Sequence, residues 1–104
     1  MNSTQRAFLR SLANRLDDSA QIGKGGLTAS VAADIDTQLT ARELVKIHVL
    51  KTADADLRDL AAQAADACGA EVVQVIGRKV VLYRHSGRRE EEGKAILLPS
   101  PNRS

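Results

Sequence analysis

Hydrophobic residues along the chain follow two alternating periods, which predicts an alternation of helices and strands. Apolar residues recur every three or four positions where helices are expected, and they alternate with polar residues where strands are expected. The predicted helices cover residues 4–16, 29–39 and 54–68. The predicted strands cover residues 19–22, 44–50, 71–76 and 80–84. Thr28 suits the N-cap of the second helix, Gly69 the end of the third, and residues 77–79 a hairpin turn.

The resulting order, α-β-α-β-α-β-β, predicts an α/β two-layer sandwich with helices packed on a mixed sheet of about four strands. A chain of 104 residues can build one hydrophobic core but not two. We therefore expect a single domain over residues 1–85. Residues 86–104 combine a charged run, glycines and two prolines, which predicts a flexible tail in which residues 95–98 could dock on the domain.

Composition excludes several function classes. Phe8 and Tyr83 are the only aromatic residues, which argues against binders that stack successive bases on rings. Cys68 is the single cysteine and only two histidines accompany it, so neither a disulfide framework nor a zinc spacing is present in the sequence. No apolar run approaches the roughly 18 residues of a membrane span, and we expect a cytoplasmic protein with no membrane partner.

The sequence contains no recognisable catalytic constellation, so neither enzyme activity nor a cofactor or metal is expected. Cys68 falls on the apolar face of an alanine-rich helix and is predicted to pack in the core. His48 alternates with the buried positions of its strand, and His85 begins the predicted tail, where fixed catalytic geometry is improbable. Three acids are better explained by helix-start electrostatics than by a metal site: Asp54, Asp56 and Asp59.

The strongest local signal is the glycine loop Gly23-Lys24-Gly25-Gly26, which lies between a predicted strand and a predicted helix. Glycines let the backbone approach a ligand, successive amides can point at an anion, and the helix start at Thr28 adds positive potential. The spacing is neither a Walker loop nor a dinucleotide fingerprint. Taken alone, the motif is explained equally well by a turn that requires positive φ.

Charge is segregated along the chain even though the net charge is only +2. Residues 1–15 carry a local +3, which includes Arg6 and Arg10 on one helical stripe. Residues 76–89 carry a local +5, whereas residues 54–71 carry a local −4. A solvated surface explains each cluster about as well as a binding surface does, but their coincidence with the glycine loop favours a polyanion partner.

The same residues, taken together, resemble the YhbY-like, single CRM-domain family of bacterial, ribosome-associated RNA-binding proteins. The matching motifs span most of residues 4–84 and are more specific than the loop alone. They are Gln5-Arg6, Leu9-Arg10, Leu12-Ala13, residues 22–28 (IGKGGLT), residues 43–47 (ELVKI), residues 75–78 (VIGR) and residues 81–84 (VLYR). Residues 96–99 (ILLP) also match the family's habitual ending.

The resemblance implies a fold like the C-terminal domain of translation initiation factor three, with a loop analogous to the KH-type G-x-x-G. It also implies association with precursor large ribosomal subunits, whose RNA and assembly proteins would be the partners, and a role in their assembly. The family residues carried over are Gly23, Lys24, Gly25 and Gly26, then Arg6 and Arg10, with Arg84 as a further candidate. A monomer is expected.

From the loop chemistry, the amides around Gly25 and Gly26 and the helix start at Thr28 would hold a phosphate, while Lys24 neutralises a neighbouring one. Arg6 and Arg10 would extend this track along the first helix. Asn14 and Asp17-Asp18 depart from the family pattern, and the two carboxylates are expected to repel RNA at that edge.

Two other functions fit the sequence. A protein-interaction adaptor could act through the acidic helix over residues 54–71 or through the edge of the final hairpin. A nucleic-acid binder similar to the Alba proteins, which bind duplexes, is the other alternative.

Overall fold

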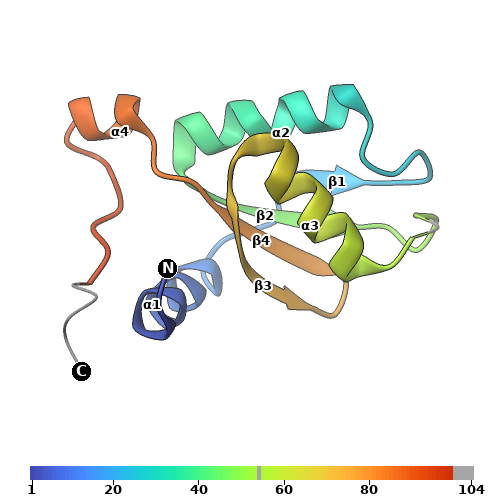
Figure 1. The fold of residues 1–104 in the computed structure, drawn as a ribbon, viewed down its shortest axis with the longest axis horizontal. Helices are drawn as coiled ribbons and strands as arrows, with labels where there is room; N and C mark the ends of the chain where they lie inside the picture. The colour runs from blue at the N-terminus through green and yellow to red at the C-terminus, as the bar shows by residue number, and fades with distance from the viewer. Residues whose placement is uncertain (54, 100–104) are drawn as a thin grey trace.

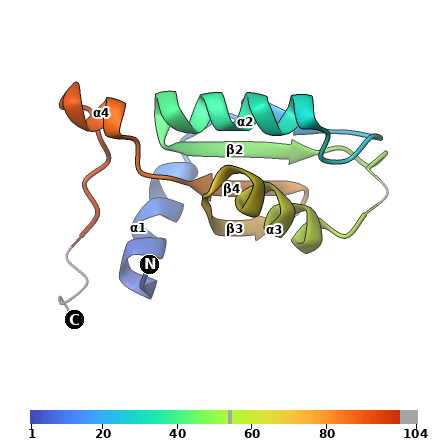
Figure 2. The ribbon, with the colours of Figure 1, turned by 45° about the horizontal axis from the view of Figure 1, so that its top comes forward.

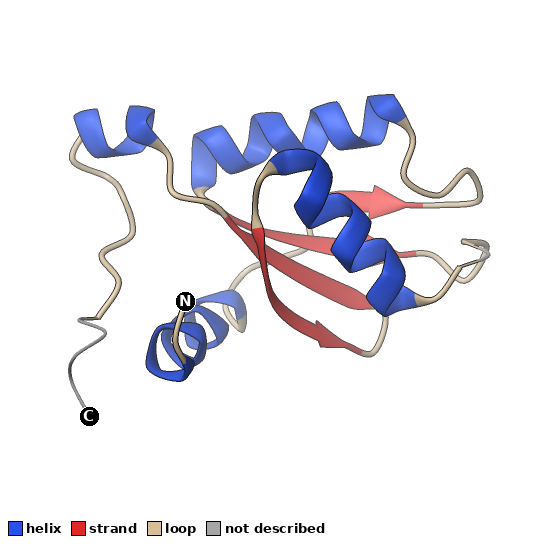
Figure 3. Cartoon of the chain, in the orientation of Figure 1, coloured by secondary structure: helices blue, strands red, loops and turns tan. Residues whose placement is uncertain are grey.

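The predicted elements are all present in the structure, a computed structural model that describes residues 1–53 and 55–99. Figure 1 shows their arrangement and Figure 3 distinguishes helices from strands. In chain order they are α1 (Ser3–Ala13), β1 (Ala20–Ile22), α2 (Ala29–Arg42), β2 (Leu44–Val49), α3 (Leu57–Cys68), β3 (Glu71–Ile76), β4 (Lys79–Tyr83) and α4 (Gly87–Glu91). Only the short helix α4 was not predicted.

Local chemistry fixes the predicted boundaries. Thr28 is the N-cap of α2, and its hydroxyl accepts a hydrogen bond from the Val31 amide at 3.2 Å. Gly69 ends α3 with φ of 61°, a left-handed conformation in which a side chain is strained. Gly77 adopts φ of 57° in the turn between β3 and β4. None of the helices in the described residues is long and apolar enough to span a membrane.

The four strands form one mixed sheet in the order β1-β2-β4-β3. β1 pairs with β2 in parallel, with Ala20 opposite Ile47, and the other two pairings are antiparallel. The prediction of a four-stranded mixed sheet is therefore confirmed. Because β1 and β2 are parallel, both strands end at the same edge of the sheet, which is where the glycine loop begins.

Helices α2 and α3 cover one face of this sheet and enclose the larger core. Alternate residues of β2 and β4 point to this face, among them Ile47 and Leu82, which are completely buried. Ile35 and Leu39 meet them from α2, and Ala64 lets α3 approach closely.

The prediction of two layers is wrong, because α1 packs on the opposite face of the sheet (Figure 2). Leu9 of α1 is completely buried against Leu44, Val81 and Tyr83, the residues of β2 and β4 that alternate with those of the larger core. Both faces of β4 are therefore apolar and buried along most of its length. Such a continuous apolar strand requires cover on both sides, and α1 supplies it at one end of the second face.

Residues 86–99 also differ from the prediction, which was a flexible tail. Ser86 caps α4, and the chain then returns so that Ile96 and Leu98 pack beside α1 against the second core. The completely buried carboxylate of Glu43 accepts hydrogen bonds from the amides of Ser86 at 2.7 Å and Ile96 at 2.6 Å. The expected docking of residues 95–98 is confirmed. The rest of the predicted tail, residues 100–104, lies outside the described residues.

Candidate functional site

The glycine loop is a tight turn that leads directly into α2. The Gly26 amide donates to the Gly23 carbonyl oxygen at 2.9 Å and closes the turn. Gly26 has φ of 67°, so a side chain at this position would be strained. A Cβ atom on Gly25 would lie 3.3 Å from the Thr28 methyl group. The two glycines therefore let the loop fold back tightly onto the start of the helix.

Several backbone donors of this loop are available to a ligand. Within residues 1–53 and 55–99, the amide of Gly25 and the amides of Ala29 and Ser30 in the first turn of α2 have no hydrogen-bond acceptor. The Gly26 amide, expected to face a phosphate, is instead used within the turn. Lys24 is exposed beside these donors. The loop thus combines free amides, a helix start and a mobile cation.

Two further loops lie at the same end of the sheet as the glycine loop (Figures 1 and 2). The Leu50 amide donates to the Ile22 carbonyl oxygen at 2.8 Å, so the residues after β2 lie next to the glycine loop. Arg78 in the hairpin turn donates from Nε to the Val49 carbonyl oxygen at 2.8 Å and from Nη2 to the Leu50 carbonyl oxygen at 2.6 Å. Arg78 thereby fastens the hairpin to the end of β2.

Lys51 is the cation at this end that the sequence analysis missed. It is exposed and follows Leu50, next to the glycine loop. No motif marks it, because a single lysine after a strand is common. The topology alone could have pointed to Lys51, since the residues that follow two parallel neighbouring strands lie at the same end of the sheet.

Arg6 and Arg10 do not form one surface with the glycine loop. Figures 1 and 2 place α1 near the opposite end of the molecule, and α1 covers the face of the sheet away from α2. Arg10 is exposed. Arg6 is half-buried, and its buried Nε has no hydrogen-bond acceptor in the described part of the chain. The predicted continuous track from the loop to α1 is therefore not supported by the geometry.

Arg84 is engaged inside the fold. Its guanidinium pairs with the Asp36 carboxylate and donates to the Cys68 carbonyl oxygen at 2.7 Å and to the Thr40 hydroxyl at 2.8 Å. These bonds join α2 to the end of α3. An arginine held by several acceptors from two helices has little freedom to meet an outside ligand, so we assign it a structural role.

Two carboxylates, Asp17 and Asp18, precede β1, and Asp18 has a cationic neighbour. Asp18 pairs with Lys79 at 2.7 Å and lies 3.7 Å from His48 Nδ1. The hydrogen bond from Lys79 lowers the pKa of Asp18 below its ordinary value. Both aspartates precede β1, at the opposite end of that strand from the glycine loop. The negative charge of Asp18 is thus offset by a neighbouring lysine.

Cys68 packs as the sequence predicts. It is buried in the larger core, its thiol lies 3.6 Å from the Ala32 carbonyl oxygen, and burial raises the pKa of the thiol. His85 Nε2 instead lies 2.8 Å from Glu90 Oε2, and its Nδ1 lies 3.3 Å from Glu43 Oε2. Within the described residues no group of three or more His, Cys, Asp or Glu side chains is arranged to hold a metal ion.

Comparison with known proteins gives consistent matches. Residues 1–84 match the CRS1 / YhbY (CRM) domain. The "Probable RNA-binding protein YqeI" of Bacillus subtilis is 37% identical over 99 residues, covering 95% of this chain and 99% of that protein. A Haemophilus influenzae protein named "RNA-binding protein" is 38% identical over 100 residues, covering 95% of each. The solution structure of the hypothetical protein SAV1595 from Staphylococcus aureus is similar with a TM-score of 0.78 and 41% identity, covering 95% of this chain and 99% of that one.

Proposed function

Because the chain belongs to the CRS1 / YhbY (CRM) domain family, we propose that it is a cytoplasmic RNA-binding protein that assists the assembly of large ribosomal subunits. The relatives named as RNA-binding proteins support the first part of the proposal, and they align over nearly the whole chain. The resemblance of the sequence motifs to bacterial, ribosome-associated members supports the second part. The protein would act as a monomer on precursor subunits.

The observation that carries the proposal is the group of free donors at the glycine loop. The amide of Gly25 and the two amides that open α2 have no acceptor within residues 1–53 and 55–99, and Gly26 makes the turn without a side chain. A phosphate placed there gains hydrogen bonds and the favourable field of the helix. Lys24 and Lys51 flank the position with mobile positive charge. This is the chemistry of a backbone clamp like the KH-type G-x-x-G loop.

Arg6 and Arg10 form a separate contact in this proposal. They lie near the other end of the molecule, whose longest dimension is 40 Å, and on the other face of the sheet. A short single strand cannot easily follow the surface between the two places. A folded RNA, which presents phosphates on several sides, can contact both. We therefore expect structured ribosomal RNA to bind more tightly than an unstructured oligonucleotide of equal length.

Fluorescence polarisation with a labelled ribosomal hairpin over a series of salt concentrations tests the loop. Each phosphate contacted contributes about −0.7 to −0.9 to the slope of log affinity against log salt. Lys24→Ala should lower affinity about threefold to tenfold and make the slope shallower by roughly 0.7. Arg58→Ala is the matched control, since Arg58 is exposed on the acidic helix α3. Equal effects of the two substitutions would sink the loop model.

Sucrose-gradient sedimentation of cell extract tests the ribosomal part separately. We expect the wild-type protein to cosediment with precursors of the large subunit, and Lys24→Ala to shift toward the top of the gradient. Cosedimentation only with small subunits, or tighter binding to duplex DNA than to the RNA hairpin, would contradict this assignment.

A further inference from the structure

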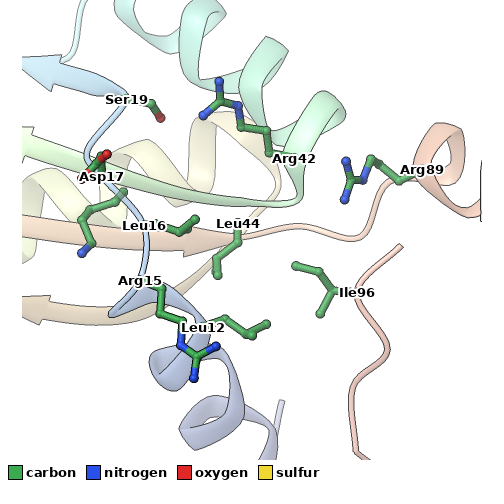
Figure 4. Close-up of a pocket in the computed structure, with 10 residues that line it drawn as sticks. Leu12, Arg15, Leu16, Asp17, Ser19, Arg42, Leu44, Arg89 and Ile96 are labelled. Carbon is green, nitrogen blue, oxygen red and sulfur yellow. The ribbon is translucent and has the colours of Figure 1, made fainter. Parts of the chain in front are cut away.

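A concave surface lies on the opposite face of the sheet from the larger core, near the end of the molecule where α1 packs. It is a pocket of about 400 Å³ between the end of α1, the start of β2 and the segment after α4. Figure 4 shows the residues that line it, which come from these segments. Its floor is aliphatic and consists of Leu12, Leu16, Leu44 and Ile96. Leu16 is still 37% exposed, so the apolar floor is open to solvent.

The pocket is surrounded by positive charge. Four of its lining residues are cations and one is an acid, Asp17; the cations are Arg15, Arg42, Lys46 and Arg89. No carboxylate of the described residues forms an ion pair with any of these four cations. Four such cations around one hollow give it a positive potential, which favours an anionic occupant.

Arg89 is the most firmly placed of the four cations. Its Nη1 donates to the Ala41 carbonyl oxygen at 3.1 Å and its Nη2 to the Lys94 carbonyl oxygen at 2.8 Å. Its Nε is buried and lacks an acceptor within residues 1–53 and 55–99. In Figure 4 its guanidinium reaches from α4 toward the pocket. The charge therefore sits in a fixed place beside the aliphatic floor.

We infer that this pocket is a docking site for an acidic segment of a partner protein, which inserts a bulky apolar side chain between the leucines. Charge complementarity selects an acidic segment, and the open aliphatic floor selects an apolar anchor. RNA fits less well. The floor offers no aromatic ring for a base, and the nearby Ser19 hydroxyl is already bonded to Gln38. The surface is distinct from the glycine loop and from the acidic helix α3.

The C-terminal segment completes this docking site. Arg89 and Ile96 both come from residues 86–99, and Glu43 holds that segment in place through two amides. The domain without the segment would keep the glycine loop but lose one wall of the pocket. The site thus gives the docked C-terminal segment a role that RNA binding at the loop does not require.

Nuclear magnetic resonance titration of the full-length, nitrogen-15-labelled protein provides the test. The probe is an eight-residue peptide of sequence EEDLFDEE with blocked ends, and EEDSSDEE is the charge-only control. We expect shifts at the amides of Leu16, Leu44 and Ile96, and none at Gly25. The variant Arg15→Ala/Arg42→Ala should weaken binding at least about tenfold, because both side chains are exposed cations of the rim. The variant Lys24→Ala/Arg58→Ala, which removes the same charge elsewhere, should bind normally.

Three results would each overturn the inference. One is the absence of shifts at the pocket amides at millimolar peptide. Another is equal binding of the charge-only peptide, which would reduce the effect to general electrostatics. The last is a 12-nucleotide RNA that shifts the pocket amides and loses affinity in the Arg15→Ala/Arg42→Ala variant, since the pocket would then belong to the RNA surface. None of these results affects the loop, which the Lys24 variant reports independently.

Discussion

Replacing Glu43 should release the C-terminal segment, because this carboxylate is the buried point to which the segment is attached. Glu43 is 0% exposed and lies directly after α2 with φ of 68°, a backbone conformation that non-glycine residues rarely adopt. Its side chain accepts the amides of Ser86 and Ile96, and its own carbonyl oxygen accepts the Arg84 amide at 2.9 Å. Glu43 thus adopts a strained backbone conformation at the position where its side chain binds the amides of Ser86 and Ile96.

The expected magnitude follows from these bonds. A hydrogen bond to a charged group contributes roughly 1.5–3 kcal/mol, so two contribute about 3–6 kcal/mol. The segment can escape the full penalty by detaching, which rehydrates both amides and exposes the half-buried Ile96 and Leu98. We therefore expect Glu43→Ala to cost about 3 kcal/mol, near the lower end of that range. Glu43→Gln keeps one acceptor and should cost about half as much.

Urea unfolding followed by circular dichroism measures this cost, and native-state hydrogen exchange locates it. Exchange should accelerate at the amides of Ser86 and Ile96 in both Glu43 variants. Glu91→Ala is the control, because Glu91 is exposed on α4 and should change stability by less than about 0.5 kcal/mol. A Glu43→Ala protein with unchanged stability and protected amides would refute the attachment. If the attachment holds, the same variant should also lose peptide binding at the pocket.

Three other predictions follow from single contacts. Thr28→Ala should cost about 1 kcal/mol in urea unfolding by removing the N-cap of α2, whereas Thr28→Ser should be nearly neutral. Lys79→Met should raise the pKa of Asp18 toward the ordinary 3.8, which carboxyl-carbon resonances can follow. In the wild-type protein the lowered pKa stabilises the fold at pH values above the pKa of Asp18 in the unfolded chain. This stabilisation is lost as the pH falls through the pKa of Asp18 in the folded protein. Cys68 should react with iodoacetamide at pH 8 much more slowly in the native protein than in urea, because burial raises its pKa; equal rates would contradict the buried placement.

The sequence predicts the elements well because local chemistry determines them. The period of apolar residues, the Thr28 cap and the glycines at 69 and 77 act within a few neighbouring residues. A parallel β1–β2 pair and an antiparallel hairpin then leave few arrangements of a small sheet. The position of the glycine loop at the end of β1 and the start of α2 follows from the same local signals.

Features that depend on which face of the sheet is covered are not local and were missed. Residues 80–83 form an unbroken apolar run, which is typical of a strand buried on both faces, but the run does not tell which element covers the second face. Because α1 packs on that second face, Arg6 and Arg10 lie away from the glycine loop and do not extend it. The resemblance makes Arg84 a binding candidate, whereas its contacts with Asp36 and Cys68 depend on helix packing and are not visible in the sequence.

The docking of residues 86–99 does not follow from their own sequence, whose charges predict a flexible tail, because the carboxylate that holds them lies more than forty residues earlier in the chain. Glu43 appears in the sequence as a charged residue before a strand, with nothing to indicate complete burial. Once Ser86 and Ile96 donate to it, the other charged residues of α4 no longer oppose folding, since Arg88, Glu90 and Glu91 remain exposed while two amides and two apolar side chains attach the segment.

A chain of net charge +2 can hold the two proposed ligand surfaces because each rests on a local arrangement of groups and not on the net charge. The proposed RNA site offers backbone amides and two lysines at one end of the sheet, where a phosphate would need no apolar contact. The pocket has cations and leucines in its lining, so the proposed anionic ligand also needs an apolar side chain to cover the leucines. Bare RNA satisfies the first requirement and an acidic peptide the second. Under the two proposals, RNA and an acidic peptide can therefore bind at once, and neither site needs a high overall charge to select its own ligand.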